Sequence, residues 1–250
     1  MAGSRRKVGV IAAAAVAVLL VVGFAGWWFV LRDDAPEEAN ITDAGATLDE
    51  AGSGAGAGSG GDAASAGLEG DWVVDASIGS FDDFSGTWAG YRVDEELQGI
   101  GATTAVGRTP DVTGSMTVEG EEVTAIDVAV DMTTLQSDSD SRDGQLRGRG
   151  LETDTFPTAT FALTSPIPLP EGIASGDQVA AEVTGDLTVH GVTNETSVTV
   201  DVQLNDGAAV VVGQAPIRLT EFDIEPPTGL RVLSIADDAT FEFQIFLTRA

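Results

Sequence analysis

The sequence contains no cysteine and only one histidine, His190. Without cysteine there are no disulfide bonds, no thiolate metal sites and no cysteine nucleophile. One histidine leaves little from which to build a histidine metal centre. Basic residues are also scarce, since 12 Lys and Arg stand against 40 Asp and Glu, for a formal charge of −28. A chain this acidic repels a phosphate backbone, so we expect no nucleic-acid partner.

The sequence also lacks the motifs of common catalytic and cofactor sites. There is no GxGxxG after a strand, no GxxxxGK[ST] phosphate loop and no GxSxG turn. Asp138, Asp140 and Asp143 precede Gly144, but a calcium-binding EF-hand needs glycine at its sixth position and Gly144 falls one position later. We therefore expect no metal, no cofactor and no catalytic residue, and we predict that the protein is not an enzyme.

The N-terminal residues have the pattern of a membrane anchor. A basic tail, residues 1–7, precedes an apolar run from Val8 to Leu31. At about 1.5 Å per residue the run reaches roughly 36 Å, enough to cross a hydrocarbon core of about 30 Å. We predict one transmembrane helix over residues 8–31, with the tail in the cytoplasm and the rest of the chain outside. The alternative is a cleaved secretory signal, whose apolar region is shorter, about 7–15 residues.

A polar segment, residues 32–69, follows the predicted anchor. It consists mainly of Gly, Ala, Ser and acidic residues and contains no aromatic residue. Such a composition buries too little apolar surface to offset its ordering entropy, so we predict a disordered linker. As a flexible coil it would span about 35 Å and would hold the following domain off the membrane without fixing its orientation.

Residues 70–250 alternate between apolar and polar side chains, which is typical of half-buried antiparallel strands. Phe246 is an exception to the alternation in the last of these runs. The only helix that the sequence suggests is short, within residues 138–149. Strands without intervening helical layers predict an all-β domain, a closed barrel or a sandwich. The clearest inward-facing sets are Ile126, Val128, Val130 and Met132; Val198, Val200, Val202 and Leu204; and Phe241, Phe243, Ile245 and Leu247.

His190 lies at the end of one of these predicted strands, with Asp186 on the same face four residues earlier. Four strand residues separate the two by about 13 Å, which excludes a direct pair. A general base needs a partner within hydrogen-bond reach, and the sequence shows none. We interpret His190 as a residue that anchors a turn by bonding to a neighbouring loop, with ligand contact as the alternative.

Two long motifs are specific enough to compare with known families. SRDGQLRGRGLETDTFPTATF contains Arg-Asp, Leu-Arg and Phe-Pro-Thr elements, and VTGDLTVHGVTNETSVTVDV contains a G-x-L-T-φ-H-G-V-T turn. Together they resemble the YceI-like family of lipid-binding proteins. The stretch LEGDWVVDASIGSF looks like the family's first strand. The resemblance covers about residues 70–247 and is that of a membrane-anchored variant. The chain departs from the family at Gly144-Gln145, where a histidine often follows the Arg-Asp pair. The matching residues are Trp72, Asp75, Arg142, Asp143, Leu146, Arg147, Phe156, Pro157, Thr158, Phe161, Gly185 and Leu187 to Thr193.

The resemblance implies an extended, lipocalin-like antiparallel β-barrel that holds an isoprenoid-type lipid in an apolar interior. Inward-facing small residues such as Gly185 and Ala159 would leave room for it, although they would also fit a tightly packed barrel. The candidate ligand-binding residues of the cavity wall are Trp88, Tyr91, Phe161 and Phe243. The candidate polar residues, which contact a ligand or stabilise the fold, are Arg142, Asp143 and His190. Arg142, Asp143 and Arg147 are predicted to form a charge-paired corner, and the alternative is that Arg142 contacts a lipid head group.

The sequence thus predicts a single-pass, extracytoplasmic lipid-binding protein that sequesters or carries its ligand beside the cell membrane. A second possibility is a surface interaction domain with a filled barrel and no ligand. A third is an enzyme that acts on a lipid, which would require a carboxylate with a perturbed pKa inside the cavity. The oligomeric state stays open.

Overall fold

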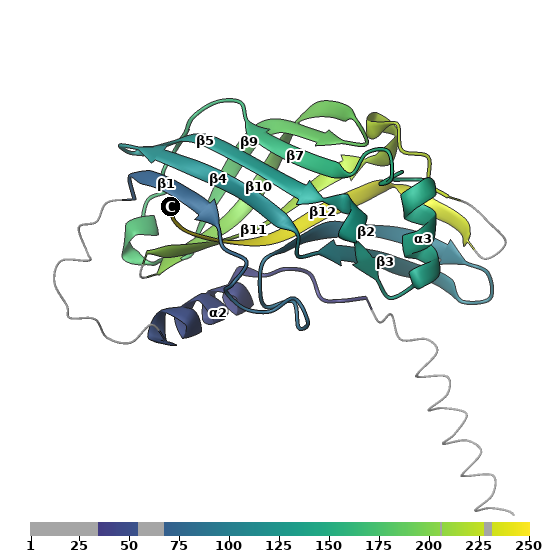
Figure 1. Ribbon diagram of the computed structural model, residues 1–250, viewed down its shortest axis with the longest axis horizontal. Helices are drawn as coiled ribbons and strands as arrows, with labels where there is room; N and C mark the ends of the chain where they lie inside the picture. The colour runs from purple at the N-terminus through teal and green to yellow at the C-terminus, as the bar shows by residue number, and fades with distance from the viewer. Residues whose placement is uncertain (1–34, 55–67, 206, 228–231) are drawn as a thin grey trace, which may run out of the picture.

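The structure is a computed structural model that describes residues 35–54, 68–205, 207–227 and 232–250 (Figure 1). Within these ranges, no helix combines the length and the apolar character needed to cross a membrane. The predicted basic tail and transmembrane helix, residues 1–7 and 8–31, lie outside the described residues.

Eight of the described strands form a closed antiparallel barrel, which confirms the all-β prediction. Their order around the barrel is β1-β4-β5-β7-β9-β10-β11-β12, and β12 pairs again with β1. A short strand, β8 (Ile167–Pro168), pairs with β5 outside this order. The barrel strands are β1 (Gly70–Val74), β4 (Val112–Glu119), β5 (Glu122–Asp131), β7 (Thr158–Leu163), β9 (Val179–Val189), β10 (Val192–Asn205), β11 (Ala208–Arg218) and β12 (Val232–Arg249).

The sheet continues beyond the closed barrel because β12 is long enough to pair with two different strands along one edge. Its first part pairs with β2 (Trp88–Leu97) and its last residues pair with β1. From β2 the sheet runs on through β3 (Gly101–Thr109) to β6 (Gln136–Ser137). Helix α3 (Asp140–Gly148) lies beside this extension (Figure 1) and is the short helix predicted within residues 138–149. Among the described residues, three 3-10 helices complete the connections: η2 (Met132–Thr134), η3 (Ile173–Ser175) and η4 (Leu219–Phe222).

Strand alternation places one set of side chains inside the barrel, as the sequence predicts. In β9, for example, Val183 and Val189 are buried whereas Asp186 is exposed. At the end of the barrel near α3, an apolar cluster packs around Tyr91, Leu135 and Phe222.

The prediction of a disordered linker over residues 32–69 is wrong for its middle part. Residues 41–54 form helix α2 (Ile41–Gly54), which lies against the outside of β10 and β11 (Figure 1). Asn40 caps its start, because the backbone N–H of Asp43 donates to the Asn40 Oδ1 at 2.9 Å. Ala44 and Leu48 are four residues apart, share one face and are both 1% exposed. These two side chains give the segment the apolar contact that its composition alone did not suggest.

Candidate functional site: an apolar cavity inside the barrel

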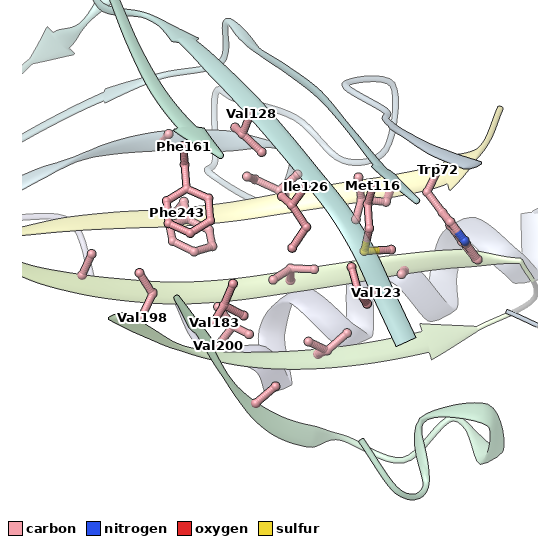
Figure 2. Close-up of a pocket in the computed structure, with 18 of the residues that line it drawn as sticks. Trp72, Met116, Val123, Ile126, Val128, Phe161, Val183, Val198, Val200 and Phe243 are labelled. Carbon is pink, nitrogen blue, oxygen red and sulfur yellow. The ribbon is translucent and has the colours of Figure 1, made fainter. Parts of the chain in front are cut away.

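An elongated cavity of about 240 Å³ occupies the barrel interior (Figure 2). Most of its wall consists of inward-facing side chains of the eight barrel strands, and residues of β2, β8, η2, η3 and the adjoining connections complete it. The residues labelled in Figure 2 show its character: Trp72, Met116, Val123, Ile126, Val128, Phe161, Val183, Val198, Val200 and Phe243.

The cavity offers almost no polar group to a ligand. Besides Trp72, only Ser115, Thr160 and Glu242 among its lining residues have polar side chains. Ser115 and Thr160 are exposed residues, and their strand neighbours face inward. The Trp72 Nε1–H donates to the carbonyl oxygen of Leu68 at 3.0 Å. Apart from Glu242, then, the polar atoms of the wall are satisfied or turned away.

Glu242 is directed to the outer side of the sheet, where two arginines neutralise it. Its carboxylate accepts hydrogen bonds from Arg108 Nε at 3.1 Å and Nη2 at 2.9 Å, and from Arg92 Nε at 3.3 Å. Burial lowers the pKa of the Arg108 guanidinium, and the attraction of Glu242 opposes that shift. The only carboxylate among the lining residues is thus tied into an ion-pair cluster outside the cavity.

Two of the four predicted wall residues, Phe161 and Phe243, line the cavity. Each ring covers a glycine on the adjacent strand, since a Cβ built on Gly185 would lie 2.4 Å from Phe161 Cζ and one on Gly213 would lie 2.4 Å from Phe243 Cζ. The expectation that Gly185 leaves open space is therefore wrong, because the space is taken by the Phe161 ring. Ala159 does line the cavity.

Trp88 and Tyr91, the other two predicted wall residues, are not among the lining residues. Trp88 faces outward beneath Arg108, whose Cζ lies 3.8 Å from the centroid of the indole. Tyr91 faces inward, but it lies in the apolar cluster near α3 and packs over Gly107. Its hydroxyl is buried without a hydrogen-bond partner among the described residues, and this burial raises the pKa of Tyr91. Neither residue therefore lines this cavity.

Arg142 and Asp143 form a polar corner on α3, outside the set of lining residues. Arg142 Nη2 lies 2.7 Å from Glu95 Oε1, and Nη1 pairs with Asp138. Burial alone would lower the pKa of Arg142, but the hydrogen bonds and charges of Asp138 and Glu95 raise it overall. Asp143 accepts from the Ser137 hydroxyl at 2.6 Å.

The charge-paired corner is therefore present, although its membership differs from the prediction. Arg147 is exposed, and it makes no ion pair within the described part of the chain. Glu95 takes its place, and its side chain is only 3% exposed. Because Glu95 is 47 residues from Arg142, sequence reasoning offered no signal for this pair.

His190 anchors the turn between β9 and β10, as the sequence predicts. Its φ of 52° and that of Gly191, 75°, form a two-residue hairpin turn. The ring bonds to two neighbouring loops, with Nδ1 3.1 Å from the Phe222 carbonyl oxygen and Nε2 2.9 Å from Glu152 Oε2. Phe156 packs against it edge-on at 4.4 Å between centroids. His190 thus joins its own turn to the segments around Phe222 and around Glu152 and Phe156.

The fold and the cavity define an antiparallel β-barrel with an apolar interior. The YceI-like domain family matches residues 72–247, and the chain belongs to this family. A UPF0312 protein of Pseudomonas paraeruginosa is 31% identical over 159 residues, which cover 56% of this chain and 79% of the relative.

Two solved structures share the fold at low sequence identity. One is a polyisoprenoid-binding domain from Saccharophagus degradans implicated in plant cell wall breakdown, with a TM-score of 0.54, 18% identity, and coverage of 72% of this chain and 98% of that domain. The other is BcnA of Burkholderia cenocepacia, with a TM-score of 0.50, 18% identity, and coverage of 64% and 95%. The chain is therefore similar to these proteins in architecture, in addition to the sequence motifs that it shares with the family.

Proposed function

We propose that the barrel binds an amphipathic lipid with an isoprenoid-type chain and sequesters or carries it beside the membrane. The observation that supports this most directly is the cavity itself, which is enclosed by apolar side chains and is not filled by them. A fold relative is a polyisoprenoid-binding domain. Binding without catalysis fits the wall, because its one carboxylate, Glu242, is neutralised outside.

The size and chemistry of the cavity favour a narrow, flexible chain. Its volume, about 240 Å³, lies a little below the ~300–1,000 Å³ of typical small-molecule sites. Affinity would come from apolar burial, which contributes about 25 cal/mol per Å² removed from water. A slender hydrocarbon chain that follows the long axis of the barrel would fit the small volume and would bury its apolar surface against the wall.

We further propose that residues 8–31 anchor the chain in the cell membrane, with the N-terminus in the cytoplasm and the barrel outside. This proposal is supported by the basic tail before the apolar run and by Trp27 and Trp28 at its far end, where interfacial aromatics are found.

Native mass spectrometry of the full chain, released from phosphatidylcholine nanodiscs that also contain an isoprenoid lipid and followed by organic extraction, tests the binding proposal. We expect one isoprenoid lipid per barrel. Val200→Trp would fill the cavity and should abolish its retention, whereas Thr199→Trp, on the exposed face of the same strand, should retain the lipid. A barrel that stays empty, and takes up no added isoprenoid, would refute the proposal and favour the interaction domain.

A further inference from the structure

Residues 35–54, here called the strap, lie along the outside of the barrel and are held at several points. Arg92 Nη2 donates to the Pro36 carbonyl oxygen at 2.6 Å, and Arg108 Nη2 donates to that of Glu37 at 2.5 Å. These are the two arginines that neutralise Glu242. The first residues of the strap are thus fastened to the most completely buried charge cluster on the outer face of the sheet.

Helix α2 fastens the second half of the strap. Its buried residues Ala44 and Leu48 cover Val210, Val212 and Phe246, whose exposures are 0%, 4% and 0%. These three side chains point out of the barrel, where β-strands usually carry polar residues. Without the strap, a continuous apolar patch would face water.

The far end of α2 is also bonded to the barrel. Asn205 Nδ2 donates to Asp49 Oδ1 at 2.5 Å. At Gly45 the helix approaches so closely that a Cβ would lie 2.1 Å from Gln203 Oε1. A 14-residue helix that contains glycine is marginal alone, so α2 depends on this docking for its stability.

The attachment changes the length of the tether between anchor and barrel. If the anchor ends at Leu31, only residues 32–35 separate it from the first fastened residue, Pro36. Four extended residues span at most about 14 Å. A free linker over residues 32–69 would instead span about 35 Å on average.

We propose that the strap holds the barrel close to the membrane, with the outer face of β2 and β3 around Arg92 and Arg108 turned toward the bilayer. The inference rests on the proposed anchor. The strap makes the tether short and fixes which face of the barrel is turned toward the bilayer. The cavity would then exchange lipid with the membrane at a fixed height and orientation.

A pair of insertions separates a strapped barrel from a freely tethered one without disturbing any packed residue. Twenty Gly/Ser residues are inserted either between residues 34 and 35 or after residue 60, in the full chain in phosphatidylcholine nanodiscs. Glu119→Cys, at an exposed site on the β4–β5 hairpin, provides the single dye position because the chain has no cysteine. Energy transfer to labelled lipid then reports the height of the barrel.

We expect the upstream insertion to raise the barrel by on the order of 10 Å and the downstream insertion to leave its height unchanged. Ala44→Asp with Leu48→Asp should release α2, and with it the whole strap, because the two backbone contacts at Pro36 and Glu37 are too few to hold it alone; both insertions should then raise the barrel. Thr42→Asp with Ala46→Asp, the same charge change on the exposed face of α2, should not.

Equal height changes from the two insertions in the otherwise unaltered chain would overturn the strap. A chain that leaves the nanodisc would overturn both the anchor and the strap. The lipid content of the barrel, measured on the same samples by mass spectrometry, reports separately on the proposed binding function.

Discussion

Replacing Arg142 by alanine distinguishes a structural corner from a lipid head-group contact. The substitution removes the cation beside Glu95, whose side chain is 3% exposed and 2.7 Å away. Removing one partner of a buried pair leaves a charge without compensation, at a cost of about 3–5 kcal/mol when both partners are buried. Arg142 is 20% exposed, and Asp138 is 72% exposed, so its pair with Arg142 adds little. We expect the free energy of unfolding to fall by about 2–4 kcal/mol.

Urea denaturation of the full chain, followed by tryptophan fluorescence, measures this loss. Arg147→Ala is the matched control, because Arg147 lies on the same helix, is exposed and should change stability by less than about 0.5 kcal/mol. Glu95→Gln in the Arg142→Ala background should recover at least about 1 kcal/mol, because no buried charge is then left unpaired. Unchanged stability together with lost lipid would refute the corner and make Arg142 a ligand contact.

Three further substitutions test other parts of the barrel. Glu242→Gln should lower the free energy of unfolding by about 2–4 kcal/mol in urea denaturation, because it leaves Arg108 buried without its counter-charge. Hydrogen bonds from Ser77 lower the pKa of Asp75 below its usual value of 3.8, so the stability that they contribute is present above about pH 4 and lost as pH falls through the lower folded-state pKa. Urea denaturation at pH 7 and pH 2.5 should therefore show a smaller acid-induced loss in Asp75→Asn. Gly213→Ala should displace the Phe243 ring, lower the melting temperature and reduce lipid retention in mass spectrometry.

Period-two alternation was sufficient to predict an all-β domain, a barrel or a sandwich, and which strand faces lie inside it; the choice of a barrel came from the family resemblance. It did not predict the strap, because the composition of residues 32–69 contains few apolar residues and the two that matter, Ala44 and Leu48, are inconspicuous. A second sequence signal for the strap lies in the barrel strand that the strap covers. Val210, Val211 and Val212 are consecutive apolar residues, and such a run indicates a strand buried on both faces. What covers the outer face could not be read from that run alone.

The residues of the cavity wall are predicted better by strand parity, that is, by the face of the strand on which a residue lies, than by the type of its side chain. Trp88 and Tyr91 are three positions apart on β2, so their side chains point to opposite faces and cannot both line one cavity. Phe161 and Phe243 have the parity of their aliphatic neighbours and do line it. Parity could not show that Tyr91 is absent from the cavity wall, because that depends on how much of the interior near α3 is filled by other side chains.

The distribution of charge limits how this barrel can recognise a lipid. The chain carries 40 acidic residues, yet the carboxylates nearest the interior, Glu242 and Glu95, are each bonded to an arginine outside the cavity wall. A bound chain therefore meets carbon along its whole length, and each buried CH₂ contributes about 0.8 kcal/mol. Under the proposed function, discrimination between lipids should follow chain length and width. Residues that contact a head group would then lie outside this apolar lining.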